Sequence, residues 1–147
     1  MAEGILRSLL PPDLAGQVTV LSAGTAAHEG MPATAYAVQA TAARGIDLNR
    51  HRSQELTAAL VRESDLILGM ESAHVDRVLE LAPEAAERTH LITAQVAEAG
   101  RAGAQGIADP IGGALDEYDD TFNKIRSHLL RWLPLIRDAV ERSEGVR

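Results

Sequence analysis

Asp65-Leu66-Ile67-Leu68-Gly69-Met70 is a short apolar run between an acidic residue and a glycine. A continuous run of this kind predicts a strand over residues 66–68 that is buried on both faces of a parallel sheet. In the following stretch, residues 71–81, apolar side chains recur at helical spacing, and Pro83 marks the end of that helix. A buried strand that leads directly into a helix predicts an α/β fold with parallel strands.

The rest of the chain continues this alternation, without an internal repeat or a linker. Apolar or β-branched runs predict further strands at residues 18–21 and 91–92. Amphipathic or alanine-rich stretches predict helices over residues 1–10, 35–44, 56–63 and 115–142. Pro11-Pro12 ends the first of these helices, Gly45 stops the second, and Pro134 predicts a kink or a new start in the last. The small, glycine-rich residues 97–106 predict a mobile loop.

Composition limits the class of protein. The chain has 147 residues, of which 46% are hydrophobic and 24% are charged, and this predicts one soluble globular domain over residues 1–147. No apolar run approaches the roughly 18 residues of a membrane-spanning helix, and no targeting segment is recognised, so we expect a cytoplasmic protein. The net charge of −7 argues against broad binding to nucleic acid or to an anionic membrane.

The sequence contains no cysteine. Disulfides, zinc–thiolate sites and a thiol nucleophile are therefore excluded from these 147 residues. No metal-ligand spacing or cofactor motif is recognised either, so we expect no metal and no cofactor.

Three polar residues are candidates for chemistry, although each has a more ordinary interpretation. Asp109, in Asp109-Pro110-Ile111-Gly112-Gly113, is either a turn-former or a general acid. Ser22 follows an expected strand and His51 lies in a polar loop, and such residues more often cap or close a turn than catalyse. None of the three decides the function by itself.

Their order along the chain is more specific. Met1-Ala2-Glu3-Gly4, Ser22-Ala23-Gly24-Thr25, Gly45-Ile46-Asp47-Leu48 with His51-Arg52-Ser53, the strand at residues 65–70, and Asp109–Gly113 ahead of Tyr118 and Thr121 follow one another at characteristic separations. Together they resemble the low-molecular-weight protein tyrosine phosphatase family over almost the whole chain. The resemblance implies a three-layer fold with a four-stranded parallel sheet in the order 2-1-3-4.

In that family, a first strand and a phosphate loop of the form Cys-x5-Arg-Ser-Pro come directly before the Met-Ala-Glu sequence. The resemblance therefore implies that this chain is truncated at its N-terminus and lacks the first strand, the nucleophilic cysteine and the phosphate-binding arginine. Either a wrong start site or a true loss would explain this.

The resemblance also implies roles for particular residues. Asp109 matches the general acid that protonates the leaving group and then activates water, which requires a suitably raised pKa. Ser22 and His51 match residues that hold an asparagine of the phosphate loop; without that partner we expect them to act only as local hydrogen-bonding groups.

The substrate class is less well defined. Tyrosine-specific members flank the Asp-Pro pair with aromatic residues, whereas this chain has Ile111 and Gly112 there. The stretch Asp109–Gly113 looks more like that of the bacterial branch that includes protein-arginine phosphatases. His28 stands where a hydrophobic pocket wall is usual, and it lines the entrance or is an exposed loop histidine.

The main hypothesis is a phosphatase whose full-length form hydrolyses protein phosphotyrosine or phosphoarginine, and of which this chain alone is inactive. The alternative is a noncatalytic binding or scaffold protein that keeps the fold. An arsenate reductase of the same fold would need redox cysteines and ranks low. Because a missing central strand leaves backbone edges unpaired, we also expect low stability or a homodimer that covers the gap.

Overall fold

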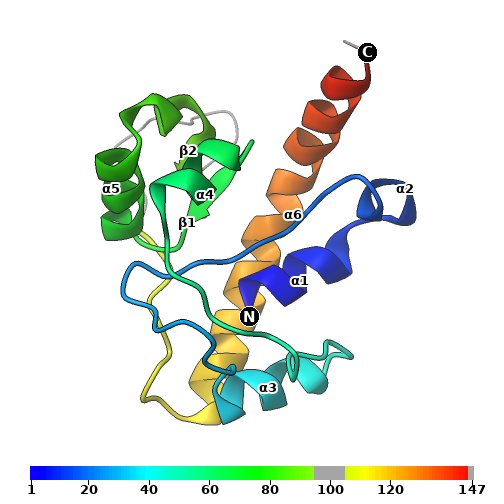
Figure 1. Cartoon of the computed structure of the whole chain (residues 1–147). Coiled ribbons are helices and arrows are strands. Elements are labelled where there is room, and N and C mark those ends of the chain that lie inside the picture. The colour runs from blue at the N-terminus through cyan, green and yellow to red at the C-terminus, as the bar shows by residue number, and fades with distance from the viewer. Residues whose placement is uncertain (95–104, 146–147) are drawn as a thin grey trace.

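The computed structural model describes residues 1–94 and 105–145. Its helices are α1 (Ala2–Leu9), α2 (Pro12–Ala15), α3 (Ala35–Ala42), α4 (Ala58–Glu63), α5 (Ser72–Leu81) and α6 (Leu115–Gly145), with a 3-10 helix, η1 (Pro83–Arg88). Its strands are β1 (Ile67–Gly69) and β2 (Thr89–Leu91). Figure 1 shows β1, β2, α4 and α5 grouped together, while α6 runs past α1 and α3.

The two strands form a parallel pair, as the sequence predicts. Ile67 lies opposite Thr89 and Gly69 lies opposite Leu91. The chain travels from one strand to the next through α5 and η1, which is the connection that a parallel pair requires. The α/β class and the parallel sheet are therefore confirmed, and β1 lies one residue later than the strand expected at residues 66–68.

The expected strand at residues 18–21 is wrong for this structure. The resemblance implies a four-stranded sheet that here lacks its first strand, and the described residues form a two-stranded sheet. A strand exists only where a neighbouring strand accepts and donates its backbone hydrogen bonds. In residues 18–21, backbone groups bind partners outside any strand. The Val18 N–H donates to the Leu14 carbonyl, and the Val20 carbonyl accepts from the Arg7 guanidinium. Residues 18–21 are thus an irregular segment held by α1 and α2.

The structure adds detail at two positions where prolines are expected to interrupt a helix. Pro11-Pro12 ends α1 but starts a second short helix, because proline suits the first helical position, where its missing N–H has no partner to lose. Pro134 does not start a new helix, since α6 continues through it from Leu115 to Gly145. The expected mobile loop at residues 97–106 falls mostly outside the described residues, which resume at Gln105.

The main core lies between α1, α6 and the end of β2. Ile5, Ile92 and Trp132 are fully buried there. The Trp132 indole N–H donates to the Ile92 carbonyl at 2.8 Å, so the most buried aromatic residue also satisfies a carbonyl just beyond β2. Burial of this kind fixes α6 against the sheet.

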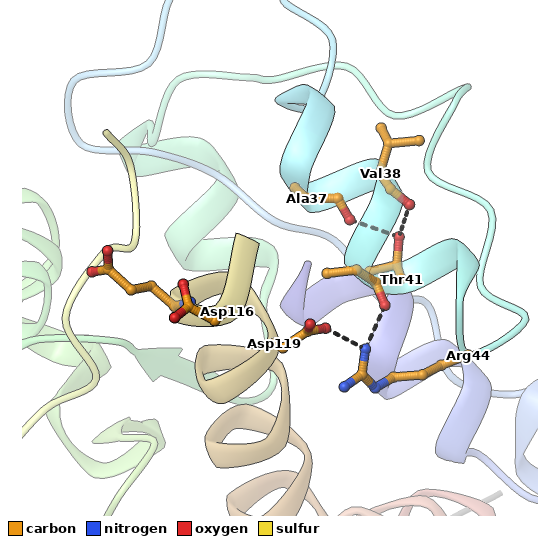
Figure 2. A network of polar contacts seen from close by, with 8 residues as sticks. Ala37, Val38, Thr41, Arg44, Asp116 and Asp119 are labelled. Atoms are coloured by element: carbon orange, nitrogen blue, oxygen red, sulfur yellow. Dashed lines mark hydrogen bonds and ion pairs between the residues drawn. The ribbon is translucent and has the colours of Figure 1, made fainter. Parts of the chain in front are cut away.

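A second contact joins the end of α3 to α6. The Arg44 guanidinium donates to the Ala40 carbonyl at 2.8 Å. It also donates to the Asp119 carboxylate at 2.7 Å, and Figure 2 shows Arg44 and Asp119 pointing toward each other. The guanidinium also lies over the Phe122 ring, 4.4 Å from the centroid. One side chain therefore satisfies a carbonyl near the C-terminus of α3 and binds two residues of α6.

Two histidines, His90 and His128, are expected to make the free energy of unfolding depend on pH. Burial lowers the pKa of His90, which stacks on Trp132, and burial with the nearby Arg131 lowers the pKa of His128. A lowered pKa means that the folded state favours the neutral imidazole, so this stability is complete above the unfolded pKa of about 6.5. It is lost as the pH falls from that value through the folded-state pKa values.

We therefore expect the free energy of unfolding to decrease between pH 7 and pH 5, before most carboxylates protonate. Urea unfolding at a series of pH values measures this. The double variant His90→Gln/His128→Gln is expected to flatten the decrease, and a slope equal to that of the unmodified chain would contradict the assignment.

In the part of the chain that the structure describes, no helix is long and apolar enough to cross a membrane.

Candidate active site

The candidate site is built around the carboxylate of Glu3, in the first turn of α1. The Ser22 hydroxyl donates to one of its oxygens at 2.5 Å, and the Arg7 guanidinium lies 2.9 Å from the other. His51 Nδ1 lies 3.6 Å from the oxygen that Ser22 binds, beyond hydrogen-bond distance. The Glu3 side chain is only 15% exposed, so these contacts are made in a partly buried place.

Ser22 and His51 therefore both lie beside the Glu3 carboxylate. The Ser22 hydroxyl donates a hydrogen bond to it, whereas the His51 ring lies beside the same oxygen without one. The family role of both residues, which is to hold an asparagine of the phosphate loop, stays a prediction. A carboxylate in the first turn is also favourable for α1, because the N-terminus of a helix carries partial positive charge.

The segment before Asp109 is anchored at the carboxyl end of β1. The Ile107 N–H donates to the Met70 carbonyl at 2.7 Å, and the Ile107 side chain is buried in the main core. Gly106 passes so close to the same turn that an added Cβ would lie 2.4 Å from the Met70 carbonyl oxygen. Asp109 thus follows, by two residues, a point fixed to the sheet.

The Asp109 side chain is exposed, and its carboxylate accepts a hydrogen bond from the Ile111 N–H at 3.0 Å. The described residues therefore leave this carboxyl on the surface. Gly112 follows with φ of 83°, a conformation that suits glycine, and so completes the turn before α6.

The N-terminus of α1 links Asp109 to the Glu3 cluster. Burial lowers the pKa of the Met1 amine, while the charges of Glu3 and Asp109 act in the opposite direction. The charges of both carboxylates therefore act on the amine at the start of α1. No side chain caps this helix start, and the free N–H groups of such starts favour anions.

His28 and Ile111 are the two candidates for a pocket wall. Both side chains are exposed, and Ile111 is 69% exposed. The structure therefore places both on the surface, as the ordinary interpretation of His28 holds. Neither fills the interior of a pocket.

The sequence did not identify Glu3 and Arg7 as site residues. Their spacing of four on a helix is a signal for an ion pair, but ion pairs of this spacing are common on exposed helix faces. What distinguishes Glu3 is its contact with Ser22, which is 19 residues away in sequence. Within residues 1–94 and 105–145, no group of three or more metal-ligating side chains is found.

A family model and individual relatives of this chain point to the same protein family. The family described as "Low molecular weight phosphotyrosine protein phosphatase" matches residues 1–144. The probable low molecular weight protein-tyrosine-phosphatase EpsP of Ralstonia nicotianae is 35% identical over 93% of this chain and 86% of its own length. The low molecular weight protein-tyrosine-phosphatase Etp of Escherichia coli K12 is 31% identical over 90% of this chain and 82% of its own length.

Solved structures of other phosphatases superimpose on this chain. The arginine phosphatase YwlE from Geobacillus stearothermophilus superimposes with a TM-score of 0.78 and 29% identity, over 94% of this chain and 84% of that one. Vibrio vulnificus Wzb, solved with benzylphosphonate, has a TM-score of 0.75 and 30% identity, over 90% of this chain and 86% of that one.

Proposed function

This chain belongs to the low molecular weight protein-tyrosine-phosphatase family, and we propose that it supplies the general acid and supporting groups of a phosphatase site. The proposal assigns the nucleophile to a Cys-x5-Arg phosphate loop that these 147 residues do not contain. The full-length form would hydrolyse protein phosphotyrosine or phosphoarginine, in the cytoplasm.

In the first proposed step, a cysteine thiolate attacks phosphorus, and the bond from phosphorus to the leaving oxygen or nitrogen breaks. Asp109 gives its proton to that leaving atom. In the second step the Asp109 carboxylate takes a proton from water, whose oxygen attacks phosphorus and releases phosphate and the thiolate. No net redox change occurs, and Asp109 ends protonated as it began.

The observation that carries this proposal is the anchoring of the Asp109 segment at the carboxyl end of β1, through the Ile107 N–H bond to the Met70 carbonyl, in a chain whose family match covers residues 1–144. In the proposed extended chain α1 follows the phosphate loop, and free N–H groups at a helix N-terminus stabilise a phosphate. We assign the protonation of the leaving group to Asp109 from its match to the general acid of the family. The Glu3 cluster holds α1 to residues 18–22 and so supports the same end of the site.

The two substrate classes have different support. The curated relatives described above are named tyrosine phosphatases, whereas one structural neighbour is named an arginine phosphatase. Ile111, exposed beside Asp109, offers an aliphatic surface and not an aromatic ring. This favours the arginine branch, while the relatives favour the tyrosine branch.

The test joins a Cys-x5-Arg segment to the chain and measures vanadate-sensitive release of phosphate. One substrate is a phosphotyrosine peptide and the other is an arginine-phosphorylated protein. Hydrolysis of either one, faster by at least about tenfold than of the other, supports the proposal and assigns the class. A folded extended chain that releases phosphate from neither would contradict it.

The second candidate is a noncatalytic binding or scaffold protein. The observation that favours it is the absence of any cysteine from the 147 residues. It requires that the chain fold alone and bind a defined protein partner. Tight binding by the chain, together with an inactive extended chain, would favour this candidate over the phosphatase.

We further propose that the 147-residue chain forms a homodimer. In the described residues β1 pairs only with β2, so the other edge of β1 has no strand beside it. Leu21, in the segment that would adjoin this gap, is 55% exposed. Uncovered edges favour pairing with another chain.

Sedimentation equilibrium over a concentration series tests the dimer. We expect the apparent mass to rise with concentration toward twice that of one chain. A cooperatively folded monomer at every concentration would contradict the expectation and would mean that the gap is closed within one chain.

A further inference from the structure

Ser53 makes an unusual set of contacts with residues 28–31. Its N–H donates to the Met31 carbonyl at 2.9 Å, and its carbonyl accepts from the Gly30 N–H at 2.8 Å. Its hydroxyl donates to the His28 carbonyl and accepts from the Met31 N–H at 3.0 Å. One residue thus uses its amide, its carbonyl and its side chain on a single loop.

Gln54 holds the other end of the same loop. Its side-chain amide donates to the Ser22 carbonyl at 2.8 Å, and its own carbonyl accepts from the Gly24 N–H at 3.0 Å. A parallel bridge pairs Gly24 with Glu55. Residues 22–31 are therefore a closed loop whose two ends are both fixed to residues 53–55.

The loop needs a left-handed residue at Gly30, where φ is 77°. That conformation directs the N–H groups of Gly30 and Met31 to the carbonyl and hydroxyl of Ser53. A Cβ added at Gly30 would meet nothing within 4 Å, so only backbone strain would result from an alanine there.

The same short segment also contacts the candidate site. His51, two residues before Ser53, faces Glu3, and Ser22, whose backbone Gln54 holds, donates to Glu3. Residues 51–54 therefore join the Glu3 cluster to the loop that carries His28. Hydrogen bonds of Ser53 and Gln54 make this connection, while the side chains of His28 and Met31 are exposed.

We propose that Ser53 is a positioning residue, which holds residues 28–31 at the border of the site so that a protein substrate meets a preformed surface. This inference rests on the proposed phosphatase function. Ser53 does not contact the reacting atoms in it. Its removal is therefore expected to weaken substrate binding and to leave the chemical step unchanged.

The first experiment uses the 147-residue chain. Amide hydrogen exchange of Ser53→Ala is expected to be faster by about tenfold at Met31, whose N–H loses the Ser53 hydroxyl. It is expected to rise also at Gly30, which keeps the Ser53 carbonyl but lies in the loop that the hydroxyl no longer holds. Exchange at Trp132 is expected to be unchanged, because the lost contacts are local. Ser127→Ala is the matched control, since the Ser127 hydroxyl donates only to a carbonyl of its own helix. Gly30→Ala, which leaves Ser53 intact, is expected to reproduce the change at Met31.

The second experiment uses the chain extended by a Cys-x5-Arg segment. Ser53→Ala is expected to raise KM for a phosphoprotein by about 3- to 10-fold with kcat retained. For a small aryl phosphate, which does not reach the loop, no change is expected. Ser53→Thr, which keeps a hydroxyl, is expected to restore KM.

The outcomes separate this inference from the function on which it rests. An inactive unmodified extended chain contradicts the phosphatase function. An active one in which Ser53→Ala leaves KM unchanged, or lowers kcat alone, contradicts the positioning role. Unchanged exchange at Gly30 and Met31 contradicts the proposed hold on the loop itself.

Discussion

The 147-residue chain by itself is expected to hydrolyse p-nitrophenyl phosphate no faster than buffer. Phosphoryl transfer depends on positioning and on charge stabilisation around phosphorus, and the chain holds neither a cysteine nor the proposed phosphate-binding arginine of the loop. Asp109 can supply only a proton. Relative to an extended chain that carries a Cys-x5-Arg segment, we expect a deficit on the order of 10⁶ in rate.

The measurement is phosphate release by purified chain, with and without vanadate. A trace of contaminating phosphatase is identified with an Asp109→Asn chain purified in the same way, because a contaminant would give equal activity in both preparations. Vanadate-sensitive turnover that the Asp109→Asn chain lacks would contradict the expectation, and would mean that the 147 residues contain a nucleophile of another type.

Asp109→Asn in the extended chain is expected to slow phosphoenzyme formation by about 10²–10⁴ on phenyl phosphate, whose leaving oxygen is basic. On p-nitrophenyl phosphate the loss is expected to be much smaller, because that leaving group needs little protonation. Asparagine keeps an oxygen that can accept from the Ile111 N–H, so the turn is expected to persist and only the proton is lost.

Single-turnover kinetics on the two substrates measure this difference. Asp120→Asn is the matched control: it makes the same chemical change at an exposed carboxylate on α6, outside the Asp109 turn. Equal losses on both substrates with Asp109→Asn would remove Asp109 from the role of the acid.

The sequence predicts the local elements of this fold better than its sheet. The run at residues 66–68 identifies β1 within one residue, and the helical spacing of residues 115–142 identifies α6. Both signals are local, because they depend on which side chains a segment must bury. The β-branched residues 18–21 give an equally clear local signal, yet they form no strand, because a strand also depends on a neighbour that propensity does not describe.

In the candidate site, too, the sequence predicts motifs along the chain but not the contacts between distant segments. The order of the motifs around Asp109, Ser22 and His51 predicts the family, which the match over residues 1–144 confirms, while the roles of these residues stay predictions. The sequence does not identify Glu3, because its contact with Ser22 spans 19 residues and forms only when α1 packs against residues 18–22. Ser53 was missed for a similar reason: its role depends on backbone groups of a distant loop, and serine is common in turns.

We propose that this chain provides the general acid, Asp109, of a phosphatase whose reaction passes through a phosphocysteine. The most direct test mixes the extended chain with a phosphorylated substrate, quenches the reaction in acid within one turnover, and examines the protein by mass spectrometry. The account predicts a phosphoryl group on the cysteine of the added segment, with slower formation in Asp109→Asn. A folded, active extended chain that releases phosphate without forming any phosphocysteine would contradict it.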